Sequence, residues 1–191
     1  MKTVVRVGVV VAVTATAALT LALGLGFAFF NLAVFFKQGD TSHFTAAPGN
    51  VNAPAPHLAY TRLDGSPANT SALQGQVVMV NFWATTCAVC VAEMPQLVAT
   101  HNMFSARGLQ TLAVAMRHDP PAYVVDFAQR KKLPFTVVID NTGSVARGYG
   151  DIQGTPTTLL INKQGVIVKR YVGVPDFQEL RQRLDGLLKA S

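Results

Sequence analysis

The apolar pattern of the chain begins with one long uncharged stretch near the amino end. Residues 7–36 carry no charged side chain and are mostly hydrophobic. About 20 apolar residues in a helix cross a bilayer core, whereas the core of a cleaved signal peptide runs only about 7–15. Lys2 and Arg6 precede the stretch, and positive side chains favour the cytoplasmic side. The pattern predicts a signal-anchor over residues 1–37, a single transmembrane helix that exports the rest of the chain; a long, cleaved signal peptide is the alternative.

The next segment has no periodic apolar positions. Residues 38–56 are rich in Pro, Ala, Asn and Gly, which is typical of a flexible tether. The remaining chain, residues 57–191, is long enough for one compact domain with a sizeable core. The predicted organisation is therefore an anchor, a linker and one exported domain.

Strand and helix patterns alternate through this domain. Residues 76–83 form a nearly continuous apolar, β-branched run, as in a buried central strand. Helical spacing of apolar residues follows over residues 88–105, in which Pro95 is expected to produce a kink. Asp176 is expected to cap the last helix. Further strands are predicted at 58–63 (an edge strand), 109–116, 135–139, 157–161 and 166–172, and a further helix at 120–131. The order predicts a mixed α/β sheet with helices on both faces, joined by a right-handed crossover.

The charge of the chain excludes one class of partner. The formal net charge is +6, but three of the 16 basic residues flank the apolar stretch, which leaves 13 against 10 acidic residues. The exported part has only one short basic run, residues 130–132. Nucleic-acid binding needs a larger basic surface, so no nucleic-acid partner is predicted.

The only two cysteines, Cys87 and Cys90, lie where the central strand passes into a helix. Free backbone N–H groups and the helix dipole at that point favour a thiolate on Cys87. A spacing of three places both sulfur atoms on one side of the helix, close enough to bond. The pair therefore predicts redox exchange, in which Cys87 attacks and Cys90 resolves the mixed disulfide. Outside the cytoplasm the pair is expected to rest as a disulfide.

Metal binding is the other use of two cysteines. A zinc site needs two more ligands, and the four histidines show no paired spacing with Cys87 and Cys90. Neither a metal nor a separate cofactor is predicted, because the Cys87–Cys90 disulfide is itself the redox group.

Thr155-Pro156 directly precedes one predicted strand. A bond before proline is nearly the only peptide bond that tolerates the cis form. A cis bond here would place the Thr155 backbone beside the dithiol, where it could hydrogen-bond an extended substrate. An ordinary trans proline that begins a strand fits the pattern equally well.

Four stretches together resemble one family of proteins. They are residues 80–90 (VNFWATTCAVC), 92–95 (AEMP), 154–158 (GTPTT) and the hairpin 162–165 (NKQG). In this order they resemble the membrane-anchored thioredoxin-like oxidoreductases of bacteria, the group that includes TlpA, ResA and CcmG. The resemblance implies a thioredoxin-like fold, Cys87 as nucleophile, Cys90 as resolving cysteine and Pro156 in cis.

The resemblance also implies a cellular role. Such proteins usually keep partner thiols reduced for cytochrome c haem attachment or copper-centre assembly. Their electrons come from a transmembrane thiol reductant. The expected location is the bacterial inner membrane, with a single pass and the C-terminal domain in the periplasm.

Glu93 follows Cys90 by three residues and can share its helix face. In the resembling proteins a glutamate here lies beneath the active site and moves protons to or from the dithiol, a task that a raised pKa suits. A carboxylate that merely favours an early helical turn is the alternative. Asn81 stands where thioredoxin has a buried aspartate, and this shifts the proton role toward Glu93. Trp83, which is expected to lie partly under the dithiol, completes the substrate-binding set with Thr155 and Pro156.

Two departures from the family pattern leave the direction of electron flow open. Thr86 replaces a tryptophan, and Val89 replaces the proline common between the cysteines. Residues at these positions tune the reduction potential, so a disulfide-introducing oxidant is one alternative to a reductant. A Cu(I)-binding metallochaperone is another, with the thiols assisted by Met103, Met116 or His118.

Overall fold

The computed structural model describes residues 50–190. The predicted anchor, residues 1–37, and residues 38–49 of the predicted tether lie outside this range. Within residues 50–190 no helix combines the length and the apolar character that a membrane crossing requires.

Five strands form the central sheet: β3 (Val77–Trp83), β4 (Leu109–Ala115), β5 (Thr136–Ile139), β6 (Thr157–Ile161) and β7 (Ile167–Val172). Their order across the sheet is β5-β4-β3-β6-β7. The first three are parallel to one another, whereas β6 is antiparallel to β3 and β7 antiparallel to β6. The predicted mixed sheet is confirmed, with the buried run of the sequence as its central strand.

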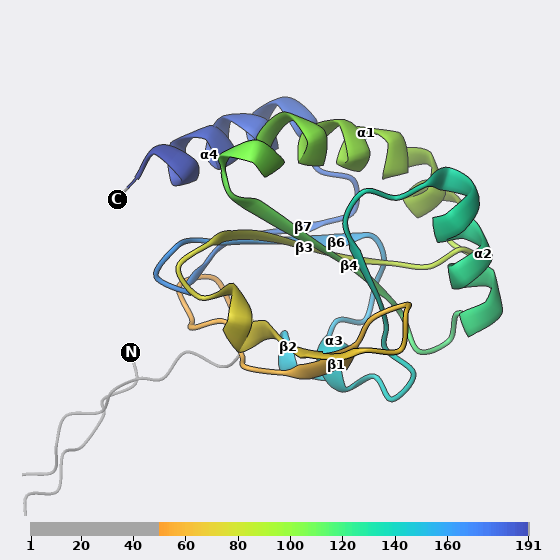
Figure 1. Ribbon diagram of the computed structural model, residues 1–191. Coiled ribbons are helices and arrows are strands. Elements are labelled where there is room, and N and C mark those ends of the chain that lie inside the picture. The colour runs from red at the N-terminus through yellow and green to blue at the C-terminus, as the bar shows by residue number, and fades with distance from the viewer. Residues whose placement is uncertain (1–49, 191) are drawn as a thin grey trace, which may run out of the picture. The chain divides into compact units, whose positions relative to one another are not determined.

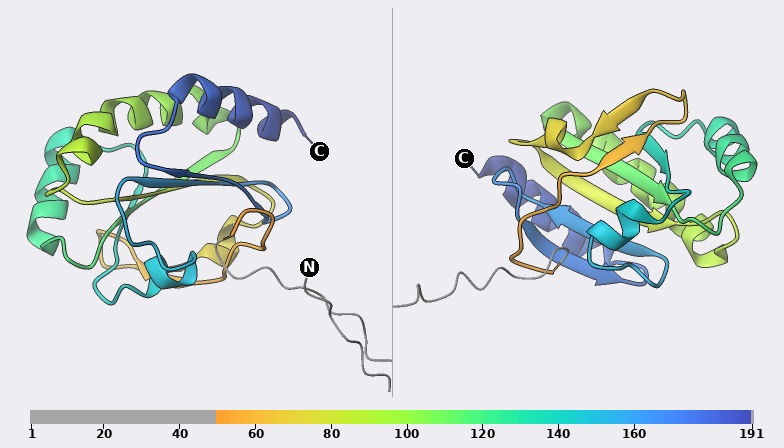
Figure 2. Two further views of the ribbon diagram at one scale, coloured as in Figure 1. Left: turned by 180° about the vertical axis from the view of Figure 1, so that it is seen from behind. Right: turned by 90° about the horizontal axis from the view of Figure 1, so that it is seen from below.

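Helices cover this sheet unequally. The helices α1 (Ala88–Phe104), α2 (Pro121–Lys131) and α4 (Phe177–Lys189) contribute side chains to one core cluster, and α1 and α4 lie above the sheet in Figure 1. The short helix α3 (Ser144–Gly148) lies on the opposite face with β1 (Ala59–Thr61) and β2 (Pro67–Asn69), as Figure 2 also shows. Helices therefore occur on both faces, as predicted.

Strand β3 divides its side chains between the two cores because successive residues point to opposite faces. Met79 and Trp83 enter the core under α1, and Val80 and Phe82 enter the core under α3. Asn81 belongs by this alternation to the α1 face, although it is polar and fully buried. A polar residue in that position requires a hydrogen-bond partner on α1 or a neighbouring strand.

The first predicted strand belongs to a small sheet of its own. Residues 58–63 are predicted as an edge strand, and β1 pairs antiparallel with β2 in a separate two-stranded sheet. One isolated bridge, Arg62 with Val138, joins this small sheet to β5. Strand β2 and helix α3 have no counterpart in the sequence prediction, because three to five residues are too few to display a period.

Part of the predicted tether belongs to the domain. Asn52 N–H donates to the carbonyl oxygen of Ile167 at 2.7 Å, and Ile167 N–H donates to that of Ala53 at 2.9 Å. Ala53 has no exposed surface. The folded domain therefore begins earlier than the predicted boundary at His57. These contacts are hydrogen bonds between backbone groups and the edge strand β7. Because they do not depend on side chains, the apolar pattern of the sequence does not indicate them.

Candidate active site

The two cysteines occupy the turn between β3 and α1. Cys87 is the N-cap residue of α1, and a disulfide joins it to Cys90 in the first turn. The Cys90 N–H points at Cys87 Sγ, 3.2 Å away, a position from which it would stabilise a thiolate. Cys90 is fully buried, whereas Cys87 is half-buried. A partner can therefore reach Cys87 alone, and Cys90 can attack the resulting mixed disulfide from the protein side.

The Thr155-Pro156 loop lies against the dithiol. Its peptide bond is cis, as the family resemblance implied. The carbonyl oxygen of Thr155 is 3.8 Å from Cys87 Sγ. Gly173 N–H donates to the carbonyl oxygen of Pro156 at 2.8 Å and holds the loop against the end of β7. The half-buried Thr155 thus presents its backbone at the edge of the dithiol, and Pro156 is buried behind it.

Glu93 lies almost entirely inside the core under α1, with 4% of its surface exposed. Asn81 Nδ2 donates to Glu93 Oε1 at 3.0 Å and to the Thr158 hydroxyl oxygen at 3.0 Å. Within the described part of the chain, Glu93 Oε2 has no hydrogen-bond partner. Burial raises the pKa of Glu93 to about 7, against the lowering effect of the Asn81 hydrogen bond. This carboxyl group therefore exchanges its proton near neutral pH, one helical turn from Cys90.

Trp83 differs from its predicted place in the substrate-binding set. Its side chain has no exposed surface, and its ring packs on that of Phe127 at a centroid distance of 5.1 Å. It belongs to the same core cluster as Cys90. A fully buried ring cannot contact a docked protein, so Trp83 supports the dithiol from the core. Position 83 is the last residue of a buried strand, and its alternation directs the side chain inward.

Asp119 is a site residue that the sequence analysis missed. It is 2% exposed, and its Oδ2 accepts a hydrogen bond from Thr85 N–H at 2.6 Å. The Thr85 hydroxyl donates to the other carboxylate oxygen. Thr85 stands two residues before Cys87, so this pair fixes the turn that carries the nucleophile. The position of the two residues in the sequence could have indicated this contact. Thr85 follows β3 and Asp119 follows β4, and the carboxyl ends of these parallel neighbouring strands meet at one edge of the sheet.

Replacing Asp119 by alanine is expected to loosen this turn. The variant leaves the Thr85 N–H without its partner, which should lower the free energy of unfolding by about 1–3 kcal/mol. Thiol exchange at Cys87 should slow as well. Asp119→Asn is the matched control, because its amide oxygen can still accept the Thr85 N–H. Urea unfolding and exchange rates test this; equal losses in both variants would contradict a positioning role based on hydrogen bonding.

The side chains considered as extra copper ligands do not form one cluster. Met103 is exposed in the last turn of α1, roughly 24 Å along the helix from Cys87 at 1.5 Å per residue. Met116 and His118 line a hollow with residues of α3 and the loop after it. Across residues 50–190, no three His, Cys, Asp or Glu side chains are grouped so that they could hold a metal ion.

Comparison with known proteins places this site in a family. The model of the redoxin family matches residues 50–184. The chain belongs to the redoxin family. Thiol-disulfide oxidoreductase ResA of Geobacillus thermodenitrificans is 32% identical over 137 residues, which cover 72% of this chain and 78% of that protein. ResA of Halalkalibacterium halodurans is 36% identical over 124 residues, 62% of this chain and 69% of that protein.

Solved structures agree with this assignment of the redoxin domain. A protein from Neisseria meningitidis assigned to the thioredoxins has a TM-score of 0.68 and 37% identity, over 76% of this chain and 93% of that one. A thioredoxin-family thiol:disulfide interchange protein from Chlorobium tepidum has a TM-score of 0.65 and 25% identity, over 75% and 98%. With the Cys87–Cys90 pair, these likenesses show a thiol–disulfide oxidoreductase of the TlpA, ResA and CcmG type.

Proposed function

We propose that this redoxin reduces disulfides of partner proteins in the periplasm, in cytochrome c or copper-centre maturation. Its electrons come from a transmembrane thiol reductant, and residues 1–37 anchor it in the bacterial inner membrane. The observation that carries the proposal is the arrangement of the dithiol: Cys87 is accessible, Cys90 is buried, and Glu93 is buried one turn away, which raises its pKa. The uncharged residues 7–36 and the ResA relatives support the location.

The exchange proceeds in two balanced steps. The Cys87 thiolate attacks one sulfur of the substrate disulfide, forms a mixed disulfide and releases the other substrate sulfur as a thiolate, which takes a proton. Cys90 then attacks Cys87 Sγ, and the second substrate thiol leaves. Two electrons pass to the substrate, and Cys87–Cys90 becomes a disulfide.

Glu93 handles the proton of the buried cysteine. Cys90 must lose its proton before it attacks, and it regains one when the transmembrane donor reduces the disulfide. The deprotonated carboxyl group of Glu93 accepts this proton, and its protonated form returns it; a pKa of about 7 makes both forms available near neutral pH. Asn81 holds one carboxylate oxygen and leaves Oε2 for the transfer.

Thr155 supplies the docking edge. Its carbonyl oxygen, 3.8 Å from Cys87 Sγ, accepts a backbone N–H from a substrate segment that lies extended across the dithiol. Val89, between the cysteines, and Val172, at the end of β7, are among the most exposed large apolar side chains of residues 50–190. They provide apolar contact on either side of the docked segment.

The reduction potential of the Cys87–Cys90 pair tests the direction of electron flow. A reductant should have a potential near that of thioredoxin, about −270 mV, whereas an oxidant such as DsbA has about −120 mV. The full chain is equilibrated in thiol–disulfide buffers of known potential, and the fraction of reduced cysteines is read by alkylation. A value close to −120 mV would reverse the proposed direction and favour a disulfide-introducing oxidant.

A further inference from the structure

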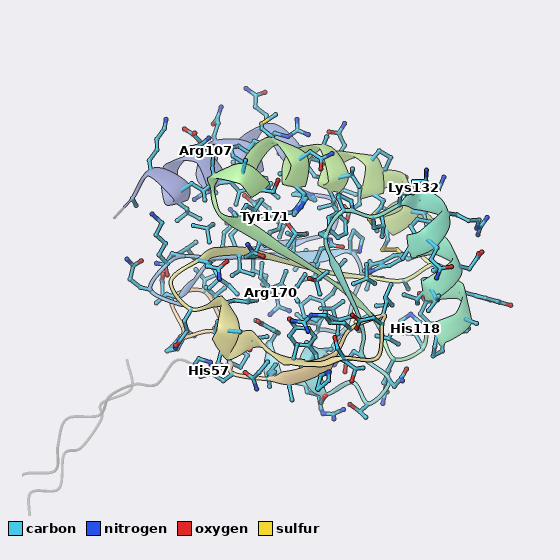
Figure 3. The ribbon with its side chains drawn as sticks, viewed as in Figure 1. His57, Arg107, His118, Lys132, Arg170 and Tyr171 are labelled. Carbon is cyan, nitrogen blue, oxygen red and sulfur yellow. A yellow bond between two sulfur atoms is a disulfide. The ribbon has the colours of Figure 1, made fainter. Side chains whose placement is uncertain are left out.

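A basic hollow lies at the same edge of the sheet as the dithiol, and the proposed function does not use it. The hollow measures about 280 Å³. Three segments line it: residues 116–118 after β4, residues 143–147 at the start of α3, and residues 151–153 ahead of Thr155. Figure 3 places His118 beside the loop that leads from β4 into α2. Segments that are far apart in the sequence thus meet at the edge of the sheet where the dithiol lies.

Two arginine side chains converge in this hollow. A Cβ atom added to Gly143 would lie 3.0 Å from Arg147 Nη1 and 3.1 Å from Arg117 Cδ, so both side chains lie over this glycine. Arg147 is held there because its Nη1 donates to the Thr142 carbonyl oxygen at 2.9 Å. A side chain at position 143 would displace the two arginines, and glycine leaves them room.

The positive charge of the two arginines in the hollow is only partly balanced within the described chain. Arg117, His118 and Arg147 line it, and Asp151 is the one acidic residue of the lining. The ion pairs within residues 50–190 include neither Arg117 nor Arg147. Two positive side chains in one hollow repel each other, and a carboxylate bound there would relieve this repulsion through charge-assisted, bidentate hydrogen bonds.

Two short stretches of the chain connect the lining of the hollow with residues beside the dithiol. Gln153 lies two residues before Thr155, whose carbonyl oxygen is 3.8 Å from Cys87 Sγ. On the other side, His118 precedes Asp119, which binds Thr85 two residues before Cys87. An extended substrate segment that runs along Thr155 advances about 3.3 Å per residue. Because Gln153 is two residues from Thr155, a segment that continues along residues 153–155 should meet the hollow about two to four residues from the cysteine that Cys87 attacks.

We infer that the hollow formed around Arg117 and Arg147 binds an acidic side chain of the substrate protein, about two to four residues from the attacked cysteine. The inference rests on the exchange function and adds a substrate class to it. A carboxylate is complementary to the positive charge of the hollow. The hollow also lies near Thr155, along which the substrate segment is proposed to dock. Disulfides flanked by Asp or Glu are the preferred substrates.

Paired peptides test the preference. Each pair shares one cystine-containing sequence and differs only in Glu or Gln at two to four residues on either side of the attacked cysteine. The full chain, in detergent micelles, is expected to exchange about two- to fivefold faster with a Glu peptide at low ionic strength. Added salt should shrink this ratio because it screens exposed charges. Arg117→Gln combined with Arg147→Gln should bring the two rates together.

The control variant removes the same charge elsewhere. Arg107→Gln combined with Arg183→Gln takes two arginines from the short turn after α1 and from α4, where they pair with Asp185 and Glu179. It should keep the preference for Glu. Equal rates for the Glu and Gln peptides with the unmodified chain, or a preference that survives in the Arg117/Arg147 variant, would overturn the inference.

The test separates this inference from the proposed reductase role. Thiol–disulfide exchange is reversible, so rates are measured with reduced protein on disulfide peptides and with oxidised protein on dithiol peptides. If only the oxidised protein reacts, the proposed reductase role fails. The preference for Glu peptides is then measured from the oxidation rates, and these rates alone decide whether the inference holds.

Discussion

Replacing Cys90 by alanine is expected to turn a transient mixed disulfide into a stable one. Cys87 stays half-buried at the turn and still attacks a substrate disulfide, but the sulfur that would release the product is gone. Covalent complexes with partner proteins should therefore accumulate in cells. Cys87→Ser should instead reduce exchange by about a thousandfold or more, because it removes the attacking sulfur.

Non-reducing electrophoresis separates the covalent complexes, and mass spectrometry identifies the partner proteins in them. Cys87→Ser combined with Cys90→Ala is the control that should trap nothing. If the Cys90→Ala chain forms no covalent complex, or if complexes form through position 90 in the Cys87→Ser chain, the assignment of attacking and resolving cysteines is wrong. Because Cys90 is fully buried, the formation of complexes through position 90 would be the more informative of these two outcomes.

Replacing Glu93 by glutamine is expected to remove the pH dependence of the resolving step near pH 7. In the proposed mechanism the carboxylate of the unmodified chain accepts the proton of Cys90, so resolution should speed up as pH rises through the pKa of Glu93, about 7. Glutamine has a similar shape and can still receive the Asn81 hydrogen bond, but it accepts no proton. At pH 8 resolution should slow by about a hundredfold, a typical contribution of a positioned general base.

The same variant should change how stability depends on pH. Burial raises the pKa of Glu93 from 4.5 to about 7 in the folded state. Between these two values the unfolded chain loses the proton and the folded chain keeps it, so the free energy of unfolding falls as pH rises. The loss is complete above pH 7 and amounts to about 3 kcal/mol. The Glu93→Gln chain should lack this decline, which urea unfolding between pH 4 and pH 8 would measure.

Asn81→Ala serves as the companion variant. It removes the hydrogen bond that lowers the pKa of Glu93, so the inflection in the resolving rate should move to higher pH rather than vanish. A change in fold alone would not shift the inflection in this direction. If the inflection near pH 7 persists in the Glu93→Gln chain, another group causes it, and the proposed proton role of Glu93 is wrong.

The sequence predicted most of the sheet because its strands are long, apolar runs. Residues 76–83 and 109–116 correspond closely to β3 and β4, and the hairpin and capped last helix are also found. The short elements β2 and α3 have no counterpart in the prediction, because tertiary contacts form them. Residues 50–56 were assigned to the tether for a related reason: their backbone bonds to residues 165–167 are independent of side-chain pattern.

At the site, the sequence by itself determined which atoms react. Two cysteines at a strand-to-helix junction, three residues apart, specify a thiol at the N-cap and a second thiol in the first turn, close enough to bond. Glu93 followed from its spacing on the same helix and from the family resemblance. These features are local, so the periods of the strand and the helix suffice to place them.

Only the tertiary structure decided what surrounds these atoms. It buried Trp83 completely, placed Asp119 against Thr85, and gave Glu93 a hydrogen bond from Asn81 in a core that raises its pKa. It also gathered the basic hollow from three separate segments. Burial and long-range hydrogen bonds depend on how distant segments pack, and no periodicity within a segment contains that information.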